Sequence, residues 1–82
     1  MNLTPTEREE ILQVYAESCR LRFIRSHGKS ITAFASDHPQ QWIKNCRDDT
    51  IQSIRDGKDT WERIAEVARK HQTMKPSTNT RL

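Results

Sequence analysis

The chain has few of the residues that build phosphate-binding loops, membrane spans or disulfide frameworks. Its 82 residues include two glycines, two cysteines and three prolines, and aromatic residues make up only 6%. Two glycines cannot form a glycine-rich phosphate loop. No stretch approaches the roughly 18 apolar residues of a transmembrane helix. These shortages exclude the familiar nucleotide-binding loops and membrane-spanning segments from the predicted functions.

The two cysteines, Cys19 and Cys46, predict free thiols rather than a disulfide, because both fall in segments expected to be helical. The N-terminus has neither the basic nor the apolar region of a secretory signal. We therefore expect a reducing, cytoplasmic environment. No two cysteines or histidines stand at the close spacing that zinc sites use, so we predict no metal and no other cofactor.

Catalytic constellations are also missing from the sequence. No serine or cysteine has a base at a spacing that would nominate it as a nucleophile. The adjacent carboxylates Asp48 and Asp49 do not form an acid pair, because neighbouring helical residues point about 100° apart. We expect a protein that is not an enzyme.

Apolar residues are sparse and charged residues frequent, at 33% and 30% of the chain. A single domain of this length buries only about 60–65% of the surface that its unfolded chain exposes. So thin a core is usually supported by a partner when disulfides and metals are absent. We therefore predict a homodimer or a hetero-complex that forms through the first helix.

The periodicity of the apolar residues predicts an all-α fold, with no alternation typical of strands. We expect a small bundle of three main helices with a short fourth helix near 31–36. The main helices should span about 5–26, 39–56 and 60–72. A single domain would thus cover 1–72 and a flexible tail 73–82, because the tail is polar and lacks periodicity.

The predicted helix ends rest on capping residues. Thr4 and Glu7 have the spacing of a capping box, and Pro5 suits the first helical position. His38 precedes Pro39 and marks a break between helices, because the residue before a proline avoids helical geometry. Further expected caps and stops are Ser30, the pair Asp59 and Glu62, and the glycines Gly28 and Gly57.

A basic cluster near the end of the first helix is the most suggestive functional feature. Residues 20–29 carry four basic side chains and no acidic one, namely Arg20, Arg22, Arg25 and Lys29, with His27 among them. One interpretation is a phosphate-binding edge for DNA. The other is a helix C-terminus whose cations complement the helix dipole.

The segment 31–47 resembles a helix-turn-helix unit, and the following residues, up to Ala65, are similar to the end of small phage-repressor-type domains. In such a unit, polar residues at the start of the second helix meet base edges. The resemblance implies groove contacts from Gln40, Gln41, Lys44 and Arg47. The usual turn glycine is absent, so an unrelated helical hairpin with a proline-started second helix stays open, and we assign no family.

A second apolar strip on the first helix supports an alternative function. Its members lie off the main apolar face and are Val14, Leu21 and Ile24. A helix that is apolar on two sides is clamped between neighbours or covered by another chain. The strip, together with alternating acidic and basic blocks, fits a protein-binding adaptor or inhibitor of the accessory or phage-encoded kind.

The two tryptophans, Trp42 and Trp61, fall on the predicted inward faces of their helices. Exposed tryptophans often dominate binding sites. In a core this small, however, two such large side chains supply a substantial share of the buried area. We expect core packing for both, with a shared interface core as the alternative.

Overall fold

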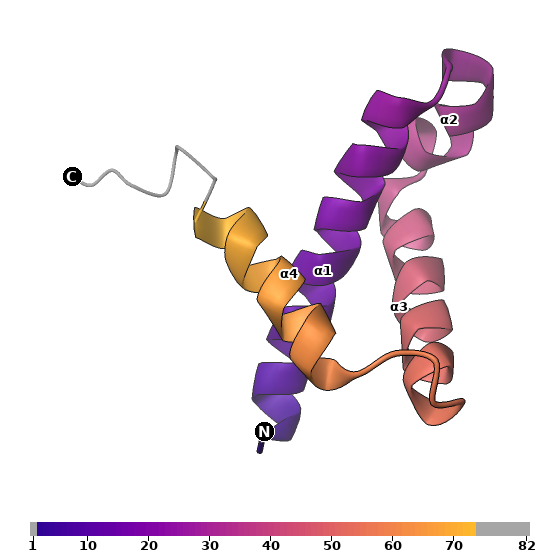
Figure 1. Cartoon of the computed structure of the whole chain (residues 1–82). Coiled ribbons are helices and arrows are strands. Elements are labelled where there is room, and N and C mark those ends of the chain that lie inside the picture. The colour runs from indigo at the N-terminus through magenta and orange to yellow at the C-terminus, as the bar shows by residue number, and fades with distance from the viewer. Residues whose placement is uncertain (1, 74–82) are drawn as a thin grey trace.

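The computed structural model describes residues 2–73, and this range forms four α-helices and no strand (Figure 1). The helices are α1 (Pro5–Ser26), α2 (Lys29–Asp37), α3 (Pro39–Arg55) and α4 (Trp61–Thr73). The predicted all-helical fold with three main helices and one shorter helix is confirmed. The expected flexible tail lies outside the described residues, except for Thr73, which ends α4.

Helix α1 begins as its sequence predicts. The Thr4 hydroxyl accepts a hydrogen bond from the Glu7 backbone N–H at 3.1 Å. The Glu7 carboxylate accepts one from the Thr4 backbone N–H at 2.9 Å. Two backbone donors that the helix leaves unsatisfied thus find partners in a reciprocal capping box, with Pro5 directly after the cap.

The corner between α1 and α2 differs from the prediction. Gly28 has a φ of −73° and is the N-cap of α2 rather than a left-handed stop for α1. Its carbonyl accepts hydrogen bonds from the backbone and hydroxyl of Thr32, at 3.0 and 3.1 Å. Because α2 already begins at Lys29, the predicted cap Ser30 lies inside the helix, and that prediction is wrong.

Helices α2 and α3 meet at a single residue, His38, as the proline after it predicts. The His38 backbone N–H still donates to the Phe34 carbonyl of α2 at 2.8 Å, while Pro39 starts α3. His38 therefore ends one helix and begins the next. The chain bends there with almost no loop.

The connection to α4 is longer and uses the second glycine. Gly57 has a φ of +77°, a left-handed conformation that side chains with a Cβ rarely adopt. The Thr60 hydroxyl then accepts a hydrogen bond from the Arg63 backbone N–H at 3.2 Å. The predicted capping box of Asp59 and Glu62 is wrong, because α4 starts at Trp61 and Thr60 is therefore its cap.

The core is built around α1. Helices α2, α3 and α4 all pack on it, and α2 also packs on α3, whereas α3 and α4 have no comparable contact. In Figure 1, α4 crosses α1 on one side while α3 runs along the other. The fold is flat, with extents of 41, 40 and 18 Å, and α1 is the helix on which the other three described helices pack.

Small residues allow α4 to approach α1 closely. Ala65 and Ala68 are buried beside Ile64, which has no exposed surface. The rest of the buried apolar core is Leu12, Tyr15, Ala16, Ala35 and Ile43. A core of so few large side chains agrees with the low apolar content of the chain.

Candidate functional site

A groove of about 450 Å³ opens along one face of α3. Six residues of α3 line it at three- and four-residue spacing, which places them on one side of the helix. They are Trp42, Asn45, Cys46, Asp49, Thr50 and Ser53. Tyr15 of α1, Phe34 of α2 and Asp59 of the last connection complete the lining. Every part of the fold except α4 itself thus contributes a side chain.

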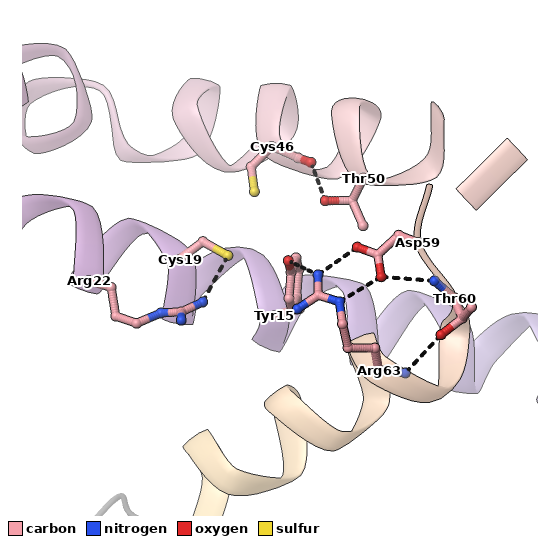
Figure 2. Close-up of polar contacts among 8 residues, drawn as sticks. All are labelled: Tyr15, Cys19, Arg22, Cys46, Thr50, Asp59, Thr60 and Arg63. Carbon is pink, nitrogen blue, oxygen red and sulfur yellow. Dashed lines mark hydrogen bonds and ion pairs between the residues drawn. The ribbon is translucent and has the colours of Figure 1, made fainter. Parts of the chain in front are cut away.

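Arg63 of α4 secures the end of the groove that Tyr15 and Asp59 form (Figure 2). Its guanidinium donates to the Tyr15 hydroxyl at 2.8 Å and to the two Asp59 carboxylate oxygens at 2.6 and 2.5 Å. The guanidinium also lies 5.6 Å from the centre of the Tyr15 ring. One side chain therefore joins α1, the connection and α4.

This network shifts the ionisation of its members. Hydrogen bonds from Arg63 hold the pKa of Asp59 below its usual value. Burial raises the pKa of Tyr15, against the opposing effect of the Arg63 hydrogen bond. Asp59 is thus a paired anion, whereas Asp49 is exposed and has no hydrogen bond or ion pair among residues 2–73. Asp49 is the carboxylate of the groove that remains available to a ligand.

The opposite end of the groove is aromatic. Trp42 is half-buried and stacks on Phe23 of α1, with ring centres 5.7 Å apart. Phe34 is 46% exposed, and Ile31, one turn earlier on α2, is 63% exposed. Trp42 and Trp61 are both partly buried, so each tryptophan packs against the fold with part of its side chain and leaves the rest exposed.

The predicted DNA-binding residues of α1 and α2 lie in different surroundings. The Arg20 Nε donates to the Ala35 carbonyl at 2.8 Å, which fastens the last turn of α2 to α1. Arg22 lies 3.5 Å from the sulfur of Cys19. Arg25 and Lys29 are exposed and make no polar side-chain contact within residues 2–73.

The predicted base-contacting residues of α3 are mostly engaged with neighbours. Arg47 pairs with Glu9 and donates to the Gln13 side chain of α1 at 3.4 Å. Two side-chain pairs form one turn apart on α3: Gln41 with Asn45 at 2.9 Å, at the rim of the groove, and Lys44 with Asp48 at 3.3 Å, on the outer face. Gln40 is exposed.

The helix pair α2–α3 has a different joint from the motif that it resembles. A helix-turn-helix unit joins its helices through a turn of about three or four residues. Here only His38 stands between Asp37 and Pro39. Gln40 and Gln41, which the resemblance implies as groove contacts, are exposed at the start of α3.

The predicted interface strip is divided along α1. Val14 is half-buried beside Ala65 and Ala68, so α4 covers this part of the strip. Farther along α1, Ile24 is half-buried and Leu21 is 37% exposed. The two-sided apolar pattern of α1 thus reflects, at Val14, clamping between neighbouring helices of the same chain.

Sequence reasoning missed most of the groove. Trp42 is expected in the core, and Asn45, Asp49 and Ser53 are not among the predicted site residues. A signal was present, since these polar residues continue the face of Trp42 at helical spacing. That they line an open groove, however, depends on the separation of α3 from α4, which no local pattern specifies.

Over residues 2–73, no three histidine, cysteine, aspartate or glutamate side chains gather into a group that could hold a metal ion. None of the described helices is long and apolar enough to cross a membrane. Comparisons with protein-family models, curated protein sequences and solved structures yield no match.

Proposed function

We propose that this chain is a small protein-binding adaptor or inhibitor whose groove receives an amphipathic helix from a larger protein. The observation that carries this proposal is the groove itself, which combines the exposed Phe34 and the half-buried Trp42 with the unpaired carboxylate of Asp49. Helices commonly bind in grooves of this kind through apolar residues at helical spacing. The splay of α3 from α4 keeps the groove open.

The lining specifies the chemistry of the incoming helix. Phe34 and Trp42 favour apolar side chains, because covering exposed aromatic surface is the main source of binding free energy in such sites. Asp49 favours a lysine or arginine on the same face of the partner helix. Asn45 and Ser53 supply hydrogen-bonding groups at the rim. The expected partner segment is therefore an amphipathic helix with at least one basic residue near its apolar stripe.

Site-specific photo-cross-linking tests this function. A photoreactive phenylalanine analogue at position 34 preserves the aromatic ring and should cross-link one protein in a lysate of the source cells. The cross-linked peptide, identified by mass spectrometry, should be an amphipathic basic helix. The same probe at Lys44, on the outer face of α3, should not capture that protein.

Two adjacent carboxylates provide a test variant and its matched control. Asp49→Lys reverses a charge in the groove, whereas Asp48→Lys makes the same change on the outer face, where Asp48 pairs with Lys44. Asp49→Lys should weaken binding of the captured protein by about tenfold or more, equivalent to roughly 1.4 kcal/mol. Asp48→Lys should leave the affinity nearly unchanged. Equal effects, or capture only from position 44, would contradict the proposal.

The exposed cations at the α1–α2 corner favour a second candidate, the binding of DNA phosphates. Arg25 and Lys29 face solvent without a polar partner in the described chain, as phosphate-contacting residues do. Binding to duplex DNA should then weaken with salt, and Arg25→Gln or Lys29→Gln should each reduce the salt slope by about one. Absence of binding at low salt would reject this candidate.

A further inference from the structure

The two cysteines meet across the interface between α1 and α3. Cys19 lies on α1 and Cys46 on α3, 27 positions apart in sequence, and Figure 2 shows both sulfurs in the space between the two helices. The Cys46 side chain extends from α3 toward α1 and the Cys19 side chain from α1 toward α3, so the two sulfurs lie next to each other across the interface. Both residues are half-buried and free. Cys46 lines the groove, and Cys19 lines a separate hollow beside Trp42.

The groups around the pair make the two sulfurs unequal. The neighbouring Cys46 thiol and the Arg22 guanidinium, 3.5 Å from the Cys19 sulfur, lower the pKa of Cys19 to about 6 against the effect of burial. Tyr15, one turn earlier on α1, acts on this pKa in the same direction as Arg22. Cys19 is therefore a thiolate near neutral pH, which is the nucleophilic form of cysteine.

Cys46 is the partner that keeps its proton. Its pKa is raised because the Cys19 sulfur lies beside its thiol, because it is buried, and because the charges of Cys19 and Asp49 oppose its ionisation. The neighbouring Thr50 side chain acts on the pKa of the thiol in the opposite direction. A thiolate and a protonated thiol in contact are the two components of a peroxide-sensitive pair.

We propose that Cys19 and Cys46 form a reversible disulfide between α1 and α3 when a hydroperoxide oxidises the protein. Cys19 is the residue that peroxide attacks first, and Cys46 is the resolving residue. This inference stands on the placement of the two side chains, which face each other between the packed helices α1 and α3, and does not depend on the proposed function.

The reaction balances with hydrogen peroxide as the oxidant. The Cys19 thiolate attacks one peroxide oxygen, so a sulfur–oxygen bond forms, the oxygen–oxygen bond breaks and hydroxide leaves. The Cys46 proton passes to that hydroxide, giving water, and the Cys46 sulfur attacks the sulfenic sulfur of Cys19. The sulfur–sulfur bond forms and the sulfur–oxygen bond breaks, so a second hydroxide leaves. Solvent took up the proton of Cys19 when that thiol ionised, and it returns a proton to this hydroxide to give the second water. Two thiols and one peroxide thus give one disulfide and two waters.

Intact-mass and peptide analysis of the full chain test the proposal. After mild peroxide treatment, the monomer should lose the mass of two hydrogen atoms, and a peptide pair joined through Cys19 and Cys46 should be found. A dithiol reductant should restore both free thiols. In Cys46→Ser the oxidation should stop at a sulfenic acid on Cys19, which dimedone traps. In Cys19→Ser the reaction with peroxide should be much slower.

A positioning role of Arg22 gives an independent measurement on folded protein. The rate of Cys19 alkylation by iodoacetamide follows the thiolate fraction, so in the wild type it should reach half its plateau at the Cys19 pKa of about 6. Arg22→Gln should move this midpoint to higher pH, and a pKa higher by one lowers the alkylation rate at acidic pH about tenfold. The exposed change Arg25→Gln is the matched control and should leave the midpoint in place.

Several results would overturn the inference. Peroxide-treated wild type that keeps both thiols, forms only intermolecular disulfides, or accumulates sulfinic acid on Cys19 would each do so. Equal alkylation midpoints for Cys19 in the folded and the urea-unfolded protein would show that the pair has no special reactivity. Because the wild type alone gives these outcomes, the test survives any variant that fails to fold.

Discussion

At the scale of single residues, Arg63 has the most connected position in the described structure. It hydrogen bonds to Tyr15 and Asp59, and its own backbone N–H is capped by Thr60. Sequence reasoning found the start of α4 but not this role, because the partner on α1 lies 48 positions away. The spacing of residues along the sequence predicts contacts within one helix, but it does not predict a hydrogen bond between residues so far apart.

Replacing Arg63 with leucine should lower the free energy of unfolding by about 1–2 kcal/mol. The change leaves the half-buried Asp59 carboxylate and the Tyr15 hydroxyl without their charged donor, and unsatisfied groups of this kind are costly. Urea denaturation at neutral pH measures the loss.

The control for this prediction is Arg69→Leu, because Arg69 is an exposed residue of the same helix. It should change stability by about 0.5 kcal/mol or less. Equal losses for the two variants would mean that the network around Arg63 contributes nothing specific.

At the scale of the elements, local sequence predicts some ends of the helices correctly and others not. The capping box of Thr4 and Glu7 and the break at His38 are both read correctly from sequence, because each depends on residues within four positions. The cap of α4 is misassigned because Asp59 and Thr60 are both good N-caps. The choice between them depends on the pairing of Asp59 with Arg63, which leaves Thr60 to cap the helix.

The two glycines should respond differently to the same substitution. Gly57→Ala should destabilise the protein by about 1 kcal/mol, because its φ of +77° strains any residue with a Cβ. Gly28→Ala should have a smaller effect, since its φ of −73° is ordinary and a Cβ there would meet nothing within 4 Å. Thermal melting of the two variants compares them directly.

A further substitution at the same corner extends this prediction. Gly28 caps α2 without a side-chain hydrogen bond, so Gly28→Asp should stabilise the protein by a few tenths of a kcal/mol. A loss of stability for Gly28→Ala as large as that for Gly57→Ala would contradict the role assigned to the positive φ.

At the scale of the whole molecule, α1 is the common support of three helices that cover it from two sides. The apolar strip with Val14 is partly explained by α4, whereas Leu21 remains open beyond it. An association through the first helix stays a prediction, and the part of α1 around Leu21 is the surface on which it would depend. The groove, in contrast, lies on the α3 side, so the two surfaces can be tested separately.

Native-state hydrogen exchange should show unequal protection among the helices. Amides in the middle of α1, around Leu12 and Ala16, should exchange only on global unfolding, because the side chains of Leu12, Tyr15 and Ala16 are buried in the core. Amides of α2 should exchange faster, because α2 is short and carries the exposed Ile31 and Phe34. Uniform protection across all four helices would contradict the central role of α1.

The sequence by itself determined the helices, since caps, prolines and three- and four-residue spacing act within a single turn or two. It also indicated that the core would be thin, because the apolar residues are few. Only the tertiary structure decided which faces remain open. The crossing of α4 over one side of α1 and the packing of α3 on the other leave Asp49 exposed in a groove and bring Cys19 to Cys46. Those contacts join residues on different helices, and the geometry of packing, rather than any local pattern, brings them together.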